Sequence, residues 1–258
     1  MSRLRSVCPD CGTYTAVAVD QEYECHSCGR AFAAGVVRVP RAWGRGGEAM
    51  AEAAHLPIPY PEAAVIDEGT LAAQTLALAR ELPDRPIILG GCCCAHVGAV
   101  EGLTARHGRI AVLWFDAHGD LNTIESSPSG NDWATPLRRL IDSGAVAPRD
   151  VALVGARNLD PPEEEFIAAN DIGLGLGAVE GALAGTAGAY VAVDFDALDE
   201  TEVAPFMPEP GGLSCAEVEA ALGVARTQAP ILGAGFTAFL PEERNIPVLE
   251  QLAAAAMF

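Results

Sequence analysis

Two short acidic motifs, each at the end of an apolar run, carry the side chains best suited to bind metal ions. The first is DAHGD at 116–120 and the second is DFDALD at 194–199. Carboxylates gathered at one edge of a sheet repel one another, so each needs a proton or a cation beside it. Hard oxygen donors with one nitrogen suit Mn²⁺ or a similar first-row ion. Solvated loop acids would explain one motif alone, but two motifs in one chain favour a metal pair held by Asp116, His118, Asp120, Asp194 and Asp196.

Cysteines form a second set of candidate metal ligands. Of the 8 cysteines, all but Cys215 fall in two tight groups, which is typical of metal chemistry rather than of disulfides. Two CxxC pairs near the N-terminus are each followed by a glycine, Gly12 or Gly29. Such pairs on adjacent hairpin turns can close a tetrahedral shell of four sulfurs around Zn²⁺, whereas the alternative, a redox-active CxxC, occurs singly at a strand-to-helix junction. We therefore expect a zinc ribbon over residues 1–35, with one structural zinc ion held by Cys8, Cys11, Cys25 and Cys28.

The pattern after residue 35 predicts the scaffold that must position these side chains. Apolar runs indicate buried strands, and helical periodicity lies between them. Because strand and helix alternate throughout, we expect a three-layer α/β fold of parallel strands covered on both faces by helices. Ligands of such sheets bind beyond the carboxyl ends of the strands, where both acidic motifs stand. The expected strands are 86–91, 109–120, 150–157, 189–196 and 230–236, and the expected helices are 67–82, 96–107, 134–143, 161–169, 215–227 and 246–257.

The charge balance argues against two classes of partner. The chain of 258 residues has 16 Lys and Arg against 35 Asp and Glu, a formal net charge of −19. Such a chain is poorly suited to neutralise the phosphates of nucleic acid or to approach an anionic membrane. No apolar run reaches the roughly 18 residues that cross a bilayer, and the first residues lack the apolar stretch of a signal peptide. We expect a cytoplasmic protein that binds neither nucleic acid nor membrane.

Five stretches in the same order resemble the motifs of the ureohydrolase superfamily, the family of arginase and agmatinase. That family has GGDHS, DAHxD with a following SGN loop, and DxDxxDP. The stretches here are GGCCCAH at 90–96, DAHGDLNT at 116–123, PSGN at 128–131, DFDALDE at 194–200 and PEPGGLS at 208–214. The resemblance covers residues 36–258 and implies an arginase-like, mainly parallel sheet of eight strands, a binuclear manganese site and a homo-oligomer. It also implies hydrolysis of a linear C–N bond, guanidino, amidino or amide, by a metal-bound hydroxide.

The resemblance implies a role for each matching residue. Asp116 and Asp194 correspond to carboxylates that bridge the two ions. His118 and Asp196 correspond to ligands of one ion. Asp120 corresponds to a ligand of the other ion that also orients the attacking hydroxide and relays its proton. The residues that match the family's contacts to a substrate's carboxylate and α-amino groups, and so imply a small amino-acid-like substrate, are Asn122, Ser129, Asn131, Asp160 and Glu163.

Cys93 is the first departure from the family pattern, because it stands where the family has a histidine ligand. His96 follows three residues on, about one helical turn away, and could face the same site. Three alternatives stay open: Cys93 is a ligand, His96 is a ligand or acts on the catalytic site from behind the ligands, or neither binds. A thiolate in place of a neutral imidazole leaves four aspartates and two dications one unit negative. A soft donor also shifts the preference from Mn²⁺ toward Zn²⁺ or Fe²⁺.

Two further departures concern the substrate. Trp133 stands where arginases have a proton-shuttling histidine, and an indole cannot titrate. Ala238 stands where the family has a glutamate that grips the guanidinium group, although a shifted loop could present Glu242 or Glu243. Without such a carboxylate a guanidinium has no bidentate partner, which argues against arginine as the substrate. The sequence favours a metal-dependent C–N hydrolase, with a non-catalytic arginase-like metal-binding or regulatory protein as the alternative; a deacetylase-like activity is least favoured, since the aspartate set suits two ions.

Overall fold

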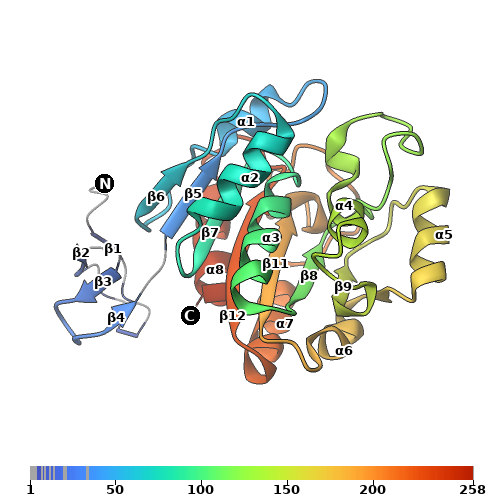
Figure 1. Cartoon of the computed structure of the whole chain (residues 1–258). Helices are drawn as coiled ribbons and strands as arrows, with labels where there is room; N and C mark the ends of the chain where they lie inside the picture. Colours follow the sequence, from blue (N-terminus) through green and yellow to red (C-terminus); the bar gives the residue numbers. More distant parts are fainter. Residues whose placement is uncertain are drawn as a thin grey trace.

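The computed structural model describes residues 5–257 apart from residues 7, 9, 12, 14, 20, 21, 33 and 34. The chain forms two separate sheets, which lie side by side in Figure 1. The smaller, N-terminal sheet has four antiparallel strands in chain order. We call this part, residues 5–32, the ribbon; its strands are β1 Arg5–Ser6, β2 Ala16–Val19, β3 Glu22–Cys25 and β4 Ala31–Phe32.

The larger sheet has eight strands in the order β10-β9-β8-β11-β12-β7-β5-β6, and every neighbouring pair is parallel. The expected parallel α/β sheet is confirmed, and each of the five predicted strands has a counterpart. The predicted strand 109–120 is shorter than expected, because pairing with both neighbours ends at Phe115 and leaves the acidic motif free to turn. The strands are β5 Gly35–Val39, β6 Glu62–Val65, β7 Pro86–Gly90, β8 Ala111–Phe115, β9 Val151–Val154, β10 Gly173–Leu174, β11 Ala189–Asp194 and β12 Ile231–Thr237.

Helices cover both faces of this sheet and complete the three layers. Successive strand residues point to opposite faces; for example, Leu113 packs into the core under one helix layer and Trp114 into the core under the other. In Figure 1, α2, α3 and α4 lie in front of the sheet, and α7 and α8 lie behind it. The front layer is α2 Leu71–Glu81, α3 Ala95–His107, α4 Pro136–Asp142 and α5 Pro161–Asn170, and the rear layer is α1 Glu48–Ala53, α6 Val179–Leu183, α7 Cys215–Gln228 and α8 Asn245–Met257.

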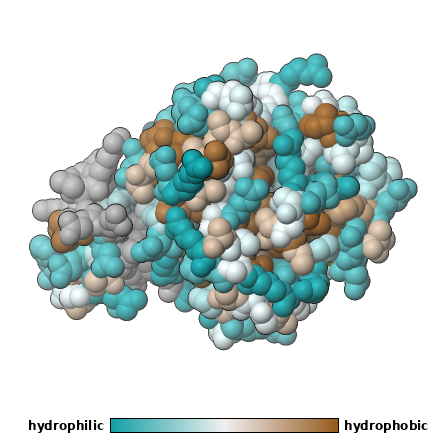
Figure 2. All heavy atoms as spheres, viewed as in Figure 1, coloured by the Kyte–Doolittle hydropathy of each residue, from teal (hydrophilic) through white to brown (hydrophobic). Residues whose placement is uncertain are grey.

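The face of the molecule seen in Figure 2 has no extended apolar patch among the residues coloured there. Hydrophobic residues on the face seen in Figure 2 occur in small groups between hydrophilic ones. The apolar C-terminal segment packs inward, since Leu249, Leu252 and Ala253 of α8 belong to the core behind the sheet. Among the described helices, none is both long enough and apolar enough to cross a membrane.

The four ribbon cysteines come together although they belong to separate CxxC pairs. The Sγ atoms of Cys8 and Cys28 lie 3.5 Å apart, and those of Cys11 and Cys25 lie 3.6 Å apart. All four sulfurs lie within 4.8 Å of one another, which is the arrangement that one tetrahedral ion needs. Gly29 takes the left-handed turn expected of it, with φ 74°, while Gly12 lies outside the described residues. One shared sulfur cluster favours a structural metal over two independent redox pairs.

Removal of this metal is expected to unfold the ribbon and to leave the larger sheet intact. The buried residues of the ribbon's own core are only Cys8, Ala16, Tyr23 and Cys25 among those described. Binding of a structural zinc ion, worth about 10–16 kcal/mol, is therefore the expected source of its folding free energy. Hydrogen exchange after chelation should therefore reveal loss of protection in β2 and β3 alone. Cys25→Ser should reproduce this loss, and Cys215→Ser, at the first residue of α7 in the core of the larger domain, should not. Unchanged protection of β2 and β3 in metal-free protein would contradict the prediction.

Candidate metal centre

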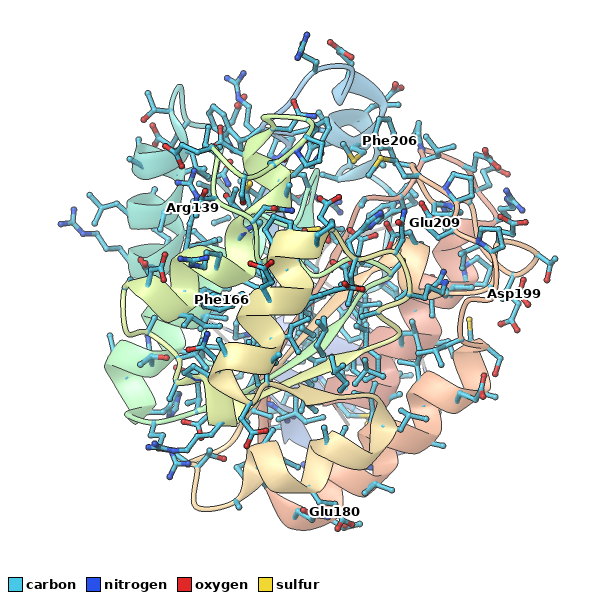
Figure 3. The ribbon with its side chains drawn as sticks, turned by 90° about the vertical axis from the view of Figure 1, so that its right-hand side faces the viewer. Arg139, Phe166, Glu180, Asp199, Phe206 and Glu209 are labelled. Atoms are coloured by element: carbon cyan, nitrogen blue, oxygen red, sulfur yellow. The ribbon has the colours of Figure 1, made fainter. Side chains whose placement is uncertain are left out.

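Three of four adjacent strands bring the predicted ligands to one edge of the sheet at their carboxyl ends. In the order β8-β11-β12-β7, Asp116 follows β8, Asp194 is the last residue of β11, and Cys93 follows β7. Because all four strands are parallel, their ends meet at the same edge. A pocket of about 270 Å³ opens there. Figure 3 shows Phe206 and Glu209 at this upper end, on the connection between β11 and α7, while Glu180 of α6 lies at the opposite end.

Two groups of three side chains each place their donor atoms within 4.8 Å of one another. The first group is Cys93, Asp116 and Asp120, and the second is Asp116, His118 and Asp196. Asp116 belongs to both groups and so lies between two candidate ion sites. Asp194 belongs to neither group, but its Oδ2 accepts a hydrogen bond from the Cys93 thiol at 2.7 Å. The structure thus brings together all six side chains that the sequence predicts as ligands of the metal pair.

Hydrogen bonds, mostly from backbone amides, hold these carboxylates in defined orientations, and Asp116 Oδ2 accepts from the indole Nε1 of Trp114 at 3.0 Å. The amide of His118 donates to Asp116 Oδ1 at 2.8 Å, the amide of Ala117 to Asp196 Oδ1 at 3.0 Å, and the amide of Asp196 to Asp194 Oδ1 at 2.9 Å. The free oxygen Oδ2 of Asp196 lies 3.0 Å from His118 Nδ1. The turns after β8 and β11 therefore orient each carboxylate before any ligand arrives, which is the preorganisation that a metal site requires.

Burial of these acids together shifts their pKa values upward. Loss of hydration, followed by repulsion from Asp196, raises the pKa of Asp116 to about 6. Burial and neighbouring carboxylates raise the pKa values of Asp120 and Asp194 well above the usual range. Burial opposes a charge on His118, but hydrogen bonds and attraction from Asp116 and Asp196 outweigh it and raise the pKa of the imidazole to about 12. The cluster therefore needs cationic charge, which protons or metal ions can supply.

Asp120 provides an independent test of whether a metal fits. Its Oδ2 is buried and has no hydrogen-bond partner among the described residues, although an unpaired buried carboxylate oxygen is costly. Its backbone has φ 53°, in the left-handed region. Such strain in a residue other than glycine persists at sites where function requires it. An ion bound by Cys93 and Asp116 would give this oxygen its missing partner, so the residues present fit a divalent cation.

His118 has two further neighbours that sequence reasoning missed. Glu209 Oε1 lies 3.7 Å from His118 Nε2 and accepts a hydrogen bond from Asn158 Nδ2 at 2.9 Å. The guanidinium of Arg157 donates to the backbone oxygens of Glu209 and Asp196 and ties this loop to the site. These contacts fix the imidazole ring with Nδ1 toward the carboxylates, as a metal ligand requires. Glu209 is part of the PEPGGLS stretch, but no sequence spacing indicates which residue of that loop faces inward.

His96 lies behind the pocket rather than in it. It is fully buried, and burial lowers the pKa of its imidazole to about 3, so the ring is neutral. Nδ1 lies 2.9 Å from the Tyr190 hydroxyl and Nε2 lies 3.1 Å from Thr237 Oγ1. Thr237 Oγ1 in turn lies 3.6 Å from Cys93 Sγ. If Tyr190 donates to His96 and His96 to Thr237, the hydroxyl of Thr237 is left to donate to the Cys93 sulfur. His96 can therefore affect the site through Thr237, and its ring also lies edge to face on Trp114, whose indole donates to Asp116.

Thr237→Val is expected to weaken metal binding at the Cys93 site by about 10–100-fold, as for other partners that orient a metal ligand. Valine keeps the shape of threonine but cannot donate to the sulfur or accept from His96. Competition with a chromophoric chelator would measure the affinity, and circular dichroism would report the fold. Thr104→Val serves as the matched control. It removes the hydrogen bond from the Thr104 hydroxyl, on α3, to the carbonyl oxygen of Ala145, and Thr104 is not part of the described lining of the pocket. Equal affinities for the two variants would contradict the relay.

The residues expected to bind substrate line the same pocket. Asn122 Nδ2 donates to Asp160 Oδ2 at 2.9 Å, and Asn122 Oδ1 accepts from Ser126. Asp160 is the residue before α5, and its amide donates to Glu163 Oε2 at 3.0 Å. The other oxygen of Glu163 accepts from the amide of Leu121 at 2.9 Å. Glu163 thus clamps the DAHGD loop to the start of α5 and orients Asp160. The remaining two predicted contacts are the loop residues Ser129 and Asn131.

The positions of Trp133 and Ala238 agree with the departures noted in the sequence. Both residues line the pocket, and Ala238 directly follows β12, between the strands that carry Asp194 and Cys93. Ala238 has φ 56°, so with Asp120 it is one of only three described non-glycine residues with positive φ. The side chains of Glu242 and Glu243 are exposed, and neither belongs to the described lining of the pocket. The loop therefore brings no glutamate to the position beside Ala238.

Comparison with known proteins establishes the family. A family model described as the arginase family matches residues 45–255. The chain belongs to the arginase family. Arginase of Bacillus caldovelox is 33% identical over 190 residues, 62% of this chain and 63% of that protein. Arginase of Staphylococcus aureus strain COL is 38% identical over 97 residues, 34% of this chain and 32% of that protein.

These arginase relatives are therefore matched over only part of their own length, 32% in the S. aureus protein and 63% in the B. caldovelox protein. A solved arginase from Bacillus cereus covers more: it matches with a TM-score of 0.72 at 25% identity, over 86% of this chain and 96% of that chain. The arginase-like fold expected from the motifs is thereby confirmed. The ribbon precedes the matched arginase-family residues 45–255.

Proposed function

We propose that this chain is a metal-dependent hydrolase that cleaves a linear C–N bond, guanidino, amidino or amide, in an amino-acid-like substrate. The observation that carries the proposal is the position of Asp116, which is shared by two buried groups of three ligands at one edge of the sheet. Membership of the arginase family supports the same chemistry. The domain division that goes with it is a zinc ribbon at 1–35 and an arginase-like metallohydrolase domain at 36–258.

Two divalent cations are the proposed cofactors of the larger domain, with one structural zinc ion in the ribbon. Manganese follows from the family resemblance, and zinc or iron is favoured if the Cys93 thiolate is a ligand. When bound, two such ions lower the pKa of a water molecule and polarise the group under attack. The proposed ligands are Cys93, Asp116, His118, Asp120, Asp194 and Asp196 for the pair, and Cys8, Cys11, Cys25 and Cys28 for the zinc ion.

The protein's own groups would orient the reactants and move protons. The carboxylate of Asp120, whose Oδ2 would bind an ion, is the proposed acceptor for the proton of the attacking water. Asp160 would hold the substrate's amino group, with Glu163 keeping Asp160 in position through its hydrogen bond. Asn122, Ser129 and Asn131 would bind its carboxylate. His96 would position the Cys93 sulfur through Thr237. A homo-oligomer in the cytoplasm, with no nucleic-acid or membrane partner, completes the proposal.

Asp120→Asn tests the function directly. Metal-loaded protein should release urea, ammonia or an amine from at least one compound in a panel of guanidino, amidino and amide derivatives of amino acids. The amide keeps the shape of the carboxylate but cannot accept the proton, and kcat should fall at least about 100-fold, as for other general bases. Glu219→Gln, a comparable change at a half-buried residue of α7 that is not part of the described lining of the pocket, should leave kcat unchanged. If wild-type protein releases no product from any compound, the chain is the non-catalytic metal-binding alternative.

A further inference from the structure

The pocket has two chemically different sides. Its acids outside the metal cluster, Asp160 and Glu163, both come from the start of α5, which follows β9. Across the cluster, toward β12, β7 and β5, the pocket is apolar. Ala238 follows β12 there, and the amide of Phe206 donates to the Ala238 carbonyl oxygen at 2.8 Å. The apolar side, which we call the apolar wall, consists of Met50, Trp133, Phe206, Met207 and Ala238.

The apolar wall is built firmly rather than being a loose loop. The rings of Trp133 and Phe206 meet edge to face with 6.1 Å between their centroids. Trp133 also packs so closely on the backbone after β5 that a Cβ added at Gly44 would lie 2.3 Å from its ring. Edge-to-face contact and close backbone packing fix the orientation of an aromatic ring. The wall therefore presents a defined apolar surface beside the metal cluster.

A cationic group against this wall would meet aromatic rings but no carboxylate partner for its N–H donors. Of the described residues that line the pocket, every carboxylate lies either in the metal cluster or at the start of α5. The Glu242 carboxylate accepts from Arg244 at 2.9 Å and remains exposed. A guanidinium lying between the cluster and the wall would lose water without gaining a carboxylate partner. A neutral amide costs less to desolvate than a charged guanidinium, and an apolar substituent on its acyl carbon would gain contact with two aromatic rings.

Resting on the proposed hydrolase function, we propose that the scissile group is an uncharged amide whose acyl carbon carries an apolar substituent seated against Trp133, Phe206 and Met207. The amine side of the amide carries the amino-acid-like end and faces Asp160. Water adds its oxygen to the acyl carbon, the C–N bond breaks, and its electron pair stays on nitrogen, which takes up a proton. The products are a carboxylate with an apolar group and a free amine.

Four compounds that release the same product test this inference. Arginine, citrulline, Nδ-acetylornithine and Nδ-benzoylornithine share one amino-acid end, and cleavage at the δ-nitrogen yields ornithine from each. Metal-loaded wild-type protein should cleave Nδ-benzoylornithine with a kcat/KM at least about tenfold above that for arginine, since even one methylene in an apolar pocket is worth about 10–200-fold. Ornithine release from arginine at an equal or higher kcat/KM would overturn the inference while leaving the hydrolase function in place.

Failure of the hydrolase function gives a different result, the absence of ornithine from all four compounds. Calorimetric binding of the same compounds to wild-type protein and to Asp120→Asn then decides the inference. Tighter binding of Nδ-benzoylornithine than of arginine supports it, and equal or tighter binding of arginine overturns it.

Met207→Glu tests the wall itself. Met207 is 40% exposed, so the chain tolerates a charge there, and the new carboxylate would face the pocket. The kcat/KM for Nδ-benzoylornithine divided by that for arginine, or the corresponding ratio of affinities, should fall at least about tenfold. Leu76→Glu is the matched control, because Leu76 is 51% exposed on α2 and the same charge there should leave the ratio unchanged. An unchanged ratio in Met207→Glu, or equal changes in both variants, would contradict the role of the wall.

Discussion

Asp116→Ala is expected to remove both divalent cations from the larger domain and to abolish hydrolysis. Asp116 is the one side chain common to both groups of candidate ligands, so its loss leaves two donors in each group. Kcat should fall at least about a thousandfold, because a metal ion supplies several kcal/mol of charge stabilisation and each 1.36 kcal/mol is a factor of ten. Elemental analysis of purified protein should find only the ribbon metal, and a product assay would measure the activity.

Asp196→Ala is the matched comparison for this prediction. Asp196 belongs to the second group only, so this variant should keep the ion held by Cys93, Asp116 and Asp120. Neither variant is expected to unfold, because each removes one carboxylate from a buried cluster whose members repel one another. If the Asp116→Ala variant kept two ions, Asp116 would not lie between two ion sites, and the binuclear proposal would fail.

The central strands and most helices of the larger domain were predictable because their periodicity is strong. β7, β8, β9, β11 and β12 are apolar at nearly every position, as expected for strands covered on both faces. β5, a buried strand inside the sheet, was not predicted, and neither were the edge strands. β6 alternates between half-buried and exposed residues, and β10 has only 2 residues. A short strand at the edge of a sheet is stabilised by its neighbour rather than by its own pattern.

The ligands of the candidate metal pair were predictable for a related reason. Their motifs follow directly from strand ends, and parallel strand ends must meet at one edge. The position of His96 was harder to predict, because Cys93 lies in a turn just before α3 begins at Ala95. The amide of His96 donates to the Cys93 carbonyl oxygen at 3.0 Å and both side chains reach Thr237, but of the two only Cys93 belongs to the described lining of the pocket. Phe206 and Glu209 could not be assigned from sequence, since the path of a loop depends on tertiary contacts such as those of Arg157.

Cys93→His is expected to change which metal the larger domain prefers. The Cys93 sulfur lies with Asp116 and Asp120 in one group of donors, so it is placed to bind as a thiolate, and a soft donor favours Zn²⁺ or Fe²⁺ over Mn²⁺. Four aspartates, a thiolate and a neutral histidine also exceed the charge of two dications by one unit. An imidazole in place of the thiolate restores neutrality and replaces a soft donor by a harder one. The affinity for Mn²⁺ relative to Zn²⁺ should therefore rise at least about tenfold, the lower end of the effect that mutating groups around metal ligands has on affinity.

Cobalt provides a readout that does not depend on turnover. A thiolate bound to Co²⁺ gives an intense near-ultraviolet charge-transfer band, which imidazole and carboxylate ligands lack. With zinc first loaded into the ribbon, Co²⁺ added to wild-type protein should produce this band, and Cys93→His should lose it while still binding Co²⁺. Cys92→Ser is the control, because Cys92 lines the same pocket but its sulfur accepts from the amide of Trp43, and the band should survive. If wild-type protein binds Co²⁺ in the larger domain without the band, Cys93 is not a ligand, and the ion beside Asp120 would depend on oxygen donors alone.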